Sequence, residues 1–172
     1  MPTIDLDETE VRELNRRLHS IDSEPDAESW RVLNPRGRHS IAVGLDASTS
    51  ILIEGHVGYY CAGMNNHADV TIAGHAGTGL AENIMSGMIR VTGNVSQSAA
   101  ASGRGGLVVI EGDASARCGI SMKGVDIVVG GSIGHGGAFM AQAGNLVVCG
   151  DAGAGLGDSI YEATLYVRGD VA

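Results

Sequence analysis

Glycine recurs in this sequence at a fixed spacing of 19 residues, and this repeat constrains the fold more than any other feature. The repeat glycines are Gly55, Gly74, Gly93, Gly112, Gly131, Gly150 and Gly169. A period held through seven glycines without slippage indicates stacked, nearly identical structural units. We interpret these glycines as structural turn residues, one in each unit.

The residues around each repeat glycine alternate in the manner of a β-strand. A branched aliphatic residue stands four positions before every glycine, and another stands two positions before it. The first set is Ile51, Val70, Ile89, Val108, Ile127, Leu146 and Leu165. The second set is Ile53, Ile72, Val91, Ile110, Val129, Val148 and Val167. Such alternation predicts a strand with one face in a core.

Nineteen residues are too few for a strand-helix-strand unit, because the crossover alone takes a dozen residues or more. They suit one rung of a parallel β-helix, in which strands stack about 4.8 Å apart. Left-handed hexapeptide helices have an apolar residue every six positions and therefore about 18 residues per rung. A sustained period of 19 has no such six-residue subperiod, which favours the right-handed form. The prediction is an all-β fold, a single-stranded right-handed parallel β-helix with 19-residue rungs and a short N-terminal α-helix.

The chain divides near residue 40. Residues 1–40 hold 15 of the 31 charged side chains. Asp7 and Glu10 match the capping-box pattern before an apolar helical stripe, so we expect residues 1–40 to form an N-terminal helix and capping segment. Residues 41–172 form the predicted β-helix. The strand around Leu165 lies close to the end, so we expect the last rung to be incomplete, continued by a longer polypeptide or covered by another subunit.

Composition excludes several classes of protein. With 44% hydrophobic and 18% charged residues the chain can bury a core, so intrinsic disorder is excluded. The formal charge of -9, without a Lys/Arg cluster, argues against nucleic acid or an anionic membrane as partner. Neither a long apolar run nor a secretory signal is present, and the expected compartment is the cytoplasm.

The three cysteines form no Cys-x-x-Cys pair. This favours reduced, buried thiols over a metal or redox site. Cys61 and Cys118 share an inward column, whereas Cys149 lies close to a repeat glycine. The cation of Arg117 beside Cys118 leaves a reactive thiol as the alternative, but the inward column favours burial.

The column after the repeat glycines holds the candidate metal ligands. His56 and His75 belong to it, but two imidazoles without a third ligand column support a metal site weakly, and we favour solvated turn residues. Asp113, Asp151 and Asp170 continue the column as in calcium-binding solenoids, although the Gly-Gly-x-Gly-x-Asp nonapeptide does not occur. We expect no catalytic, cofactor-binding or metal site on this chain.

Some rungs carry large residues where the others carry Gly, Ala or Ser. These residues are Tyr59, Tyr60, Met64, Asn65, Arg104, Arg117, Met122 and Lys123. Tyr, Met and Arg are enriched at interface cores. The set therefore predicts a surface for a protein partner, with ordinary surface variation as the alternative.

Three runs carry a resemblance to a known family: residues 33–45 (LNPRGRHSIAVGL), 58–64 (GYYCAGM) and 118–124 (CGISMKG). They resemble the small β-helical subunit of methylamine-glutamate N-methyltransferase, also called N-methylglutamate synthase. That subunit is similar to the Gly-x-Gly-x-Gly domain ending the large chain of glutamate synthase. The resemblance extends from about Asp5 to the end of the sequence, and family members continue further.

The resemblance implies a division of labour among subunits. One partner is expected to be a class II glutamine amidotransferase-like subunit, and another a glutamate-synthase-like barrel that carries FMN and an iron-sulfur cluster. The complex forms N-methylglutamate and ammonia from glutamate and methylamine. The resemblance assigns no catalytic or cofactor-binding side chain to the β-helical subunit, whose implied part is structural.

Two other functions remain open at this stage. The chain could be the scaffold of a formylmethanofuran-dehydrogenase-type enzyme, which shares the glycine repeat. It could also be a free-standing solenoid acting on a ligand such as a polysaccharide. The second reading is disfavoured because six dispersed aromatic residues do not form an aromatic column.

Overall fold

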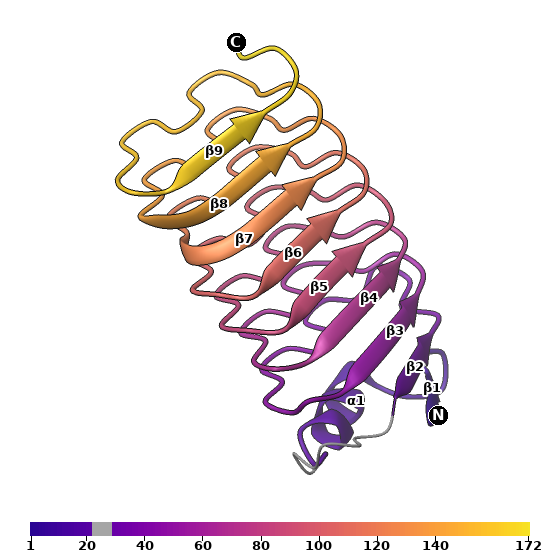
Figure 1. Ribbon diagram of the computed structural model, residues 1–172. Helices are drawn as coiled ribbons and strands as arrows, with labels where there is room; N and C mark the ends of the chain where they lie inside the picture. The colour runs from indigo at the N-terminus through magenta and orange to yellow at the C-terminus, as the bar shows by residue number, and fades with distance from the viewer. Residues whose placement is uncertain (22–28) are drawn as a thin grey trace.

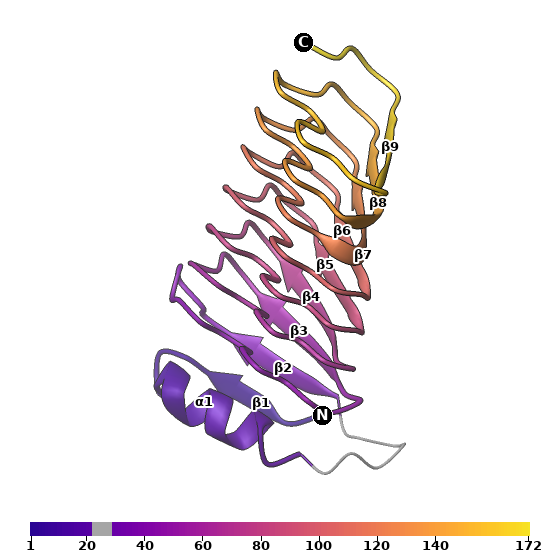
Figure 2. The same ribbon diagram turned by 90° about the vertical axis from the view of Figure 1, so that its left-hand side faces the viewer.

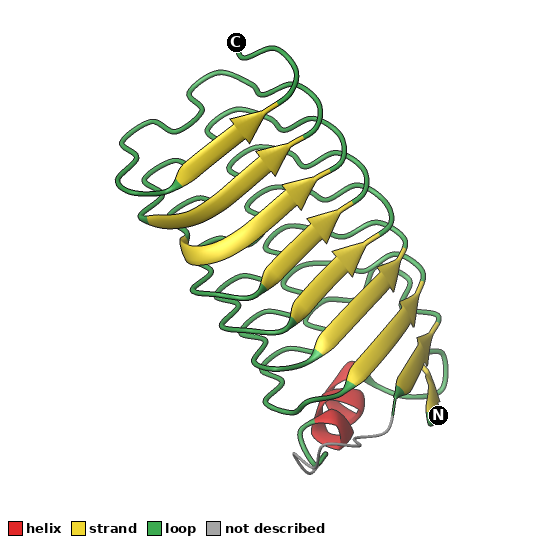
Figure 3. Ribbon diagram, viewed as in Figure 1, coloured by secondary structure: helices red, strands yellow, loops and turns green. Residues whose placement is uncertain are grey.

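The computed structural model describes residues 1–21 and 29–172 (Figure 1). In this part of the chain, nine parallel strands form one sheet in sequence order. The strands are β1 (Thr3–Asp5), β2 (Trp30–Leu33), β3 (Ser50–Glu54), β4 (Asp69–Ala73), β5 (Met88–Val91), β6 (Leu107–Ile110), β7 (Lys123–Val129), β8 (Ala143–Val148) and β9 (Thr164–Val167). One helix, α1 (Val11–Leu18, red in Figure 3), accompanies them among the described residues, which include no helix long and apolar enough to span a membrane.

The chain winds as a right-handed solenoid. In Figure 1 the strands run to the right across the front, the return segments pass behind them, and each rung lies above the one before. Figure 2 shows the strands and the return segments on opposite sides of the stack. Parallel crossovers have this hand almost without exception. The predicted fold class is confirmed.

The 19-residue period sets the register of the sheet. From β3 onward each strand pairs with the next at that offset, for example Ile53 with Ile72 and Ile110 with Val129, except at the start of β7, where Lys123 pairs with Ala143 before a register shift. These inward side chains are fully buried, each above its equivalent in the previous rung. The sheet also includes β1 and β2, so it crosses residue 40, where the composition changes.

The repeat glycines are needed because of close approach between rungs. A Cβ on Gly112 would lie 2.8 Å from the carbonyl oxygen of Gly93 and would overlap Oδ1 of Asn94. That Oδ1 accepts the backbone N–H of Asp113 at 2.9 Å. Gly55 has a positive φ, whereas the other six repeat glycines do not. Six of the seven repeat glycines are therefore explained by the space that the hydrogen-bond acceptor of the previous rung requires, and not by a turn conformation that needs a positive φ.

The same hydrogen bond repeats along the column that follows the glycines, which we call the corner column. Its residues are His56, His75, Asn94, Asp113, Ser132, Asp151 and Asp170. Each of the first six accepts the backbone N–H of the next member, at 2.8–3.0 Å. Glycine and polar follower thus act together to bind one rung to the next.

The return wall, residues 58–68 and their equivalents in later rungs, has an unusual backbone. In the first such rung Tyr60, Ala62 and Met64 have φ between 52° and 58°, and the same three columns keep a positive φ in every following complete rung. This conformation costs an L-residue about 1–2 kcal/mol, a cost that glycine alone escapes. Overlapping turns result, such as the 3.3 Å bond from Gly63 N to Tyr60 O.

Helix α1 covers the lower end of this wall. Oδ1 of Asn15 accepts the N–H of Ala42 at 2.9 Å, and Nε2 of His19 donates to the carbonyl of Val43 at 2.7 Å. One rung higher, the N–H equivalent to that of Ala42 belongs to Ala62 and donates to a carbonyl of the rung below. The side chains of Asn15 in α1 and of its C-cap residue His19 therefore take over bonds that another rung would make.

The start of α1 differs from the expected capping box. Glu10 occupies the N-cap position and makes no side-chain cap hydrogen bond. The predicted cap, Asp7, instead forms an ion pair with Arg36. The prediction of Asp7 as N-cap is wrong because a neighbouring segment supplies a charged partner for this carboxylate.

The corner geometry predicts different responses to alanine at two glycines. We expect Gly112→Ala to lower the free energy of unfolding by about 3 kcal/mol, because Cβ strikes backbone and displaces the Asn94 acceptor. Gly136→Ala is the control: it also loses a glycine but has only Arg117 Cγ nearby, at 3.7 Å. Because no neighbouring atom obstructs the new Cβ, only the strain of alanine at this positive φ should lower the free energy of unfolding, by about 1 kcal/mol. Equal losses in urea unfolding would contradict this account.

Candidate interaction surface

The corner histidines His56 and His75, predicted from the sequence to be solvated turn residues, also make specific contacts between rungs. The rings of His56 and His75 stack with their centroids 4.8 Å apart. Nδ1 of each ring accepts a backbone N–H from the next rung, at 3.0 and 2.8 Å. Within residues 1–21 and 29–172 the structure contains no group of three or more His, Cys, Asp or Glu placed to hold a metal ion. These imidazoles are therefore structural hydrogen-bond acceptors.

The aspartates of the corner column have the same role. Oδ1 of Asp113 accepts the N–H of Ser132 at 2.8 Å, and Oδ1 of Asp151 accepts that of Asp170 at 2.9 Å. The carboxylates point along the stack toward the next rung. The arrangement stabilises rung stacking and does not gather carboxylates around a common point.

The thiols separate into two kinds. Cys61 and Cys118 are fully buried, and burial raises the pKa of each thiol to about 12. Cys149 is exposed on the outer side of the sheet, directly after β8. The prediction of a buried thiol is confirmed for the first two and wrong for Cys149, because the alternation of strand residues turns position 149 outward.

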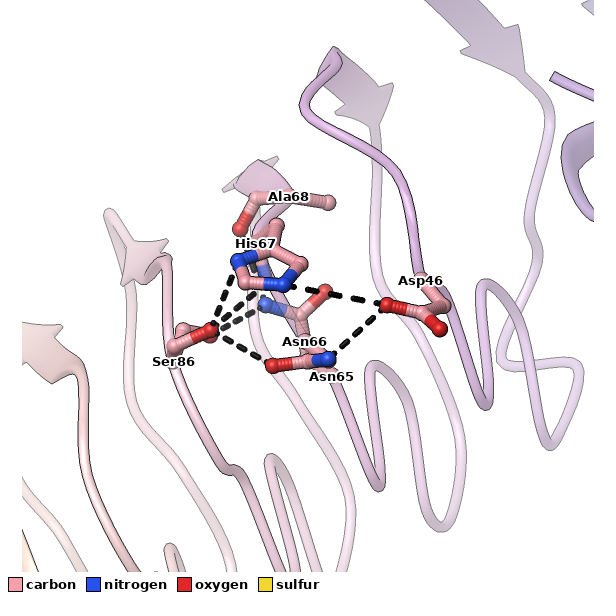
Figure 4. A network of polar contacts seen from close by, with 6 residues as sticks. All are labelled: Asp46, Asn65, Asn66, His67, Ala68 and Ser86. Carbon is pink, nitrogen blue, oxygen red and sulfur yellow. Dashed lines mark hydrogen bonds and ion pairs between the residues drawn. The ribbon is translucent and has the colours of Figure 1, made fainter. Parts of the chain in front are cut away.

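A polar network joins three rungs at the end of the return wall (Figure 4). Asn66 Nδ2 donates to Asp46 Oδ1 at 2.8 Å, and Ser86 Oγ donates to Asn66 Oδ1 at 2.7 Å. The ring of His67 lies between them, with Nδ1 3.3 Å from Ser86 Oγ and Nε2 3.9 Å from Asp46 Oδ1. Since the hydroxyl proton of Ser86 is directed to Asn66, His67 is not placed to take it as a base.

Sequence reasoning did not find this network. Its members are about one period apart, but they differ in type from rung to rung, so no repeated column marks them. The pairing of Asp46 with Asn66 across a parallel bridge brings the segments together. We interpret the network as a connection between rungs.

Three predicted interface residues form an exposed apolar cluster. Tyr59, Tyr60 and Met64 are 52%, 48% and 49% exposed. The ring of Tyr59 stacks on His39 at a centroid distance of 4.5 Å and meets Tyr60 edge-on at 6.5 Å. Tyr60 and Met64 also border a pocket of about 290 Å³ that includes Glu82. The cluster is thus exposed yet fixed in place by ring contacts.

Two predicted interface residues lie inside the molecule. Asn65 and Met122 are fully buried in one inward column, which also holds Ile84. Nδ2 of Asn65 donates to the carbonyls of Ala68 and Ser86, at 2.8 and 2.9 Å. The interface prediction is wrong for Asn65 and Met122, because this position of each rung faces the core and cannot reach a partner.

The three predicted cations are exposed: Arg104 and Arg117 lie on the return wall, and Lys123 is the first residue of β7, where the wall meets the sheet. None of them forms an ion pair with a carboxylate of the described residues. Six other arginines do form such pairs: Arg16, Arg17, Arg31, Arg36, Arg38 and Arg90. Among residues 1–21 and 29–172, the charges of Arg104, Arg117 and Lys123 are therefore uncompensated by any ion pair.

We refer to Tyr59, Tyr60, Met64, Arg104, Arg117 and Lys123 as the wall patch. Its apolar members lie in the rung that follows β3, and its cations lie two and three rungs later. The sequence predicted these six residues because they are larger than their equivalents in other rungs. It gave no sign of which of the large residues on the wall point into the core.

Comparison with known proteins finds a partial sequence match to a bacterial protein. Over 70 residues it is 58% identical to Protein GlxC of Rhizobium meliloti (strain 1021). The match covers 41% of this chain and 31% of GlxC, so the chain spans about a third of the length of this relative. No protein family model and no solved structure matches the chain. The expected similarity to the glutamate synthase domain stays a prediction.

The reactivity of the three cysteine thiols tests which of them are buried. At about pH 8 we expect one thiol per folded chain, that of Cys149, to react readily with Ellman's reagent, and three to react after unfolding in guanidinium. The buried thiols should remain silent because they are inaccessible and their pKa is raised. A Cys149→Ser variant, with no fast thiol, is the control. Rapid reaction of two or three thiols in the folded chain would contradict the structure.

Proposed function

We propose that this chain is a non-catalytic structural subunit of a glutamate-synthase-like complex that forms N-methylglutamate and ammonia from glutamate and methylamine. In this proposal it positions an amidotransferase-like subunit and a barrel subunit that binds FMN and an iron-sulfur cluster. The observation that carries the proposal is the wall patch, an exposed aromatic cluster with uncompensated cations on a rigid solenoid. The family resemblance of the sequence and the partial similarity to GlxC support it.

Rigidity is the first argument for a positioning role. Each rung is bound to its neighbours through the sheet, the corner column and the return wall. On the wall the N–H groups alternate in direction: Ala81 donates to Cys61 in the rung below, and Asn83 donates to Ala101 in the rung above, both at 2.9 Å. A body bonded in this way keeps two docked proteins at a constant separation and orientation.

The conformation of Tyr60 and Met64 is the second argument. Both have a positive φ, where Gly79 and Ser102 stand in the equivalent columns of other rungs. Large side chains are unfavourable in this region, and half of each is exposed to solvent. Met140 shares this conformation, but Tyr60 and Met64 border one pocket and Tyr60 lies against Tyr59, so we assign their role to contact with a partner.

Charge is the third argument. Arg104 and Lys123 occupy the same column on successive rungs and lack carboxylate partners among the described residues. Like charges so arranged repel each other unless an opposing surface neutralises them. The proposed partner surface is therefore acidic where it meets these side chains.

Co-purification tests the assembly directly. We expect the chain to purify with the amidotransferase-like and barrel subunits, and the complex, but not the isolated chain, to convert methylamine and glutamate. Turnover of both substrates by the isolated chain as a monomer would contradict a structural role. Molybdenum or tungsten with a pterin in the complex would instead identify the formylmethanofuran-dehydrogenase-type scaffold.

Substitutions in the wall patch test the contact. We expect Tyr60→Gly and Met64→Ser each to weaken partner binding on the order of tenfold, as truncated interface anchors do. Met140→Ser is the matched control, because Met140 is an exposed methionine with φ 54° in the same column as Met64. It should leave binding unchanged in surface plasmon resonance. Equal effects of Met64→Ser and Met140→Ser would contradict the patch.

A further inference from the structure

The outer face of the sheet changes character along the solenoid. One outward position of the strands is mixed in the early rungs, with Arg31 in β2, Leu52 in β3, Thr71 in β4 and Arg90 in β5. From β6 onward the same position carries Val109, Val128, Val147 and Tyr166. The valines are partly exposed, and Tyr166 is 56% exposed. The last four strands therefore present a continuous row of apolar side chains to the outside.

Ion pairs cover the earlier strands but not this row. Arg31 binds Glu54 at 2.7 Å, and Arg90 binds Glu111 at 2.7 Å, each across neighbouring strands. The outward position of Glu54 and Glu111 is taken in the next two rungs by Gly130 and Cys149, both exposed and uncharged, and in the rung of β9 by the exposed cation Arg168. We call Val109, Val128, Val147 and Tyr166, with Gly130 and Cys149, the outer stripe.

Acidic side chains border the outer stripe. Asp113, Asp151 and Asp170 of the corner column lie on one side of it, and Asp126 of β7 lies on the other, all exposed. None of these carboxylates forms an ion pair with a Lys or Arg of the described residues. Four carboxylates against the cation of Arg168 leave this border net acidic, and such a surface is complementary to an apolar patch bordered by lysine and arginine.

We infer that the outer stripe is a second docking surface, which binds a protein partner through an apolar patch with a basic border. This inference rests on the proposed function and adds a second contact to it. A second copy of this chain is disfavoured as the occupant, since two acidic borders would face each other. The strands and the return wall lie on opposite sides of the stack (Figure 2), so the two surfaces allow one solenoid to lie between two proteins.

Cys149 reports on this surface because its thiol lies within the stripe. In the complex assembled with the amidotransferase-like and barrel subunits, we expect maleimide to modify Cys149 on the order of tenfold more slowly than in the isolated chain. An assembled complex in which Cys149 reacts at the free rate would overturn the inference and leave the proposed function intact. Failure of the complex to assemble would overturn both.

Two arginine substitutions in one column provide a matched comparison. We expect Val128→Arg to raise the dissociation constant for one partner by about tenfold or more, because it places a charged side chain against the partner's apolar patch, inside its basic border. Thr71→Arg puts the same side chain at the same outward position three rungs earlier, outside the stripe, and should change binding by less than about twofold. The strand accepts arginine there, as Arg90 shows. Equal binding of both variants would overturn the inference.

Self-association is the remaining alternative, and it has its own readout. We expect the maleimide rate of Cys149 in the isolated chain to be independent of protein concentration, and sedimentation to show a monomer. A rate that falls with concentration while dimers appear would show a second copy on the stripe, which would overturn the assignment of a basic partner.

Discussion

The hydrogen bond at each corner is the interaction on which the rest of the structure depends. A polar side chain accepts the N–H of the residue one period later, and the glycine before that residue leaves the space for it. This geometry explains why glycine recurs every 19 residues and why His, Asn, Asp and Ser are interchangeable after it. Because every rung repeats it, the strands and return segments stay in register, and large surface side chains are held in fixed relative positions.

Much of the fold was predictable from the sequence because the register follows from the period alone. Once residues 19 apart lie above each other, the buried faces of Ile53, Ile72 and their equivalents are determined. The side-chain directions on the return wall were not predictable, because alternation of positive and negative φ has no simple periodicity in composition. Asn65 and Met122 therefore looked like surface residues although they face the core. The network around Ser86 was missed because it does not repeat.

The proposed function follows from the surface residues that the repeated hydrogen bonds and the core do not use. The candidate reactive groups of the corner column are engaged by backbone N–H groups, and the buried thiols are desolvated. What remains distinctive is the surface: Tyr60 and Met64 in an unfavourable conformation, cations on and beside the return wall that have no carboxylate partner in the described part of the chain, and an apolar row on the opposite side. These features are those of a body that other proteins bind, and they motivate the proposal of a scaffold between two subunits.

A cryo-microscopy map of the assembled complex tests the central claim most directly. The account predicts that the solenoid lies between two different subunits, one on the return wall and one on the outer face of the last four strands, with flavin and cluster density enclosed by the barrel subunit. A prosthetic group held by this chain, or a solenoid that touches neither subunit through these two surfaces, would contradict it.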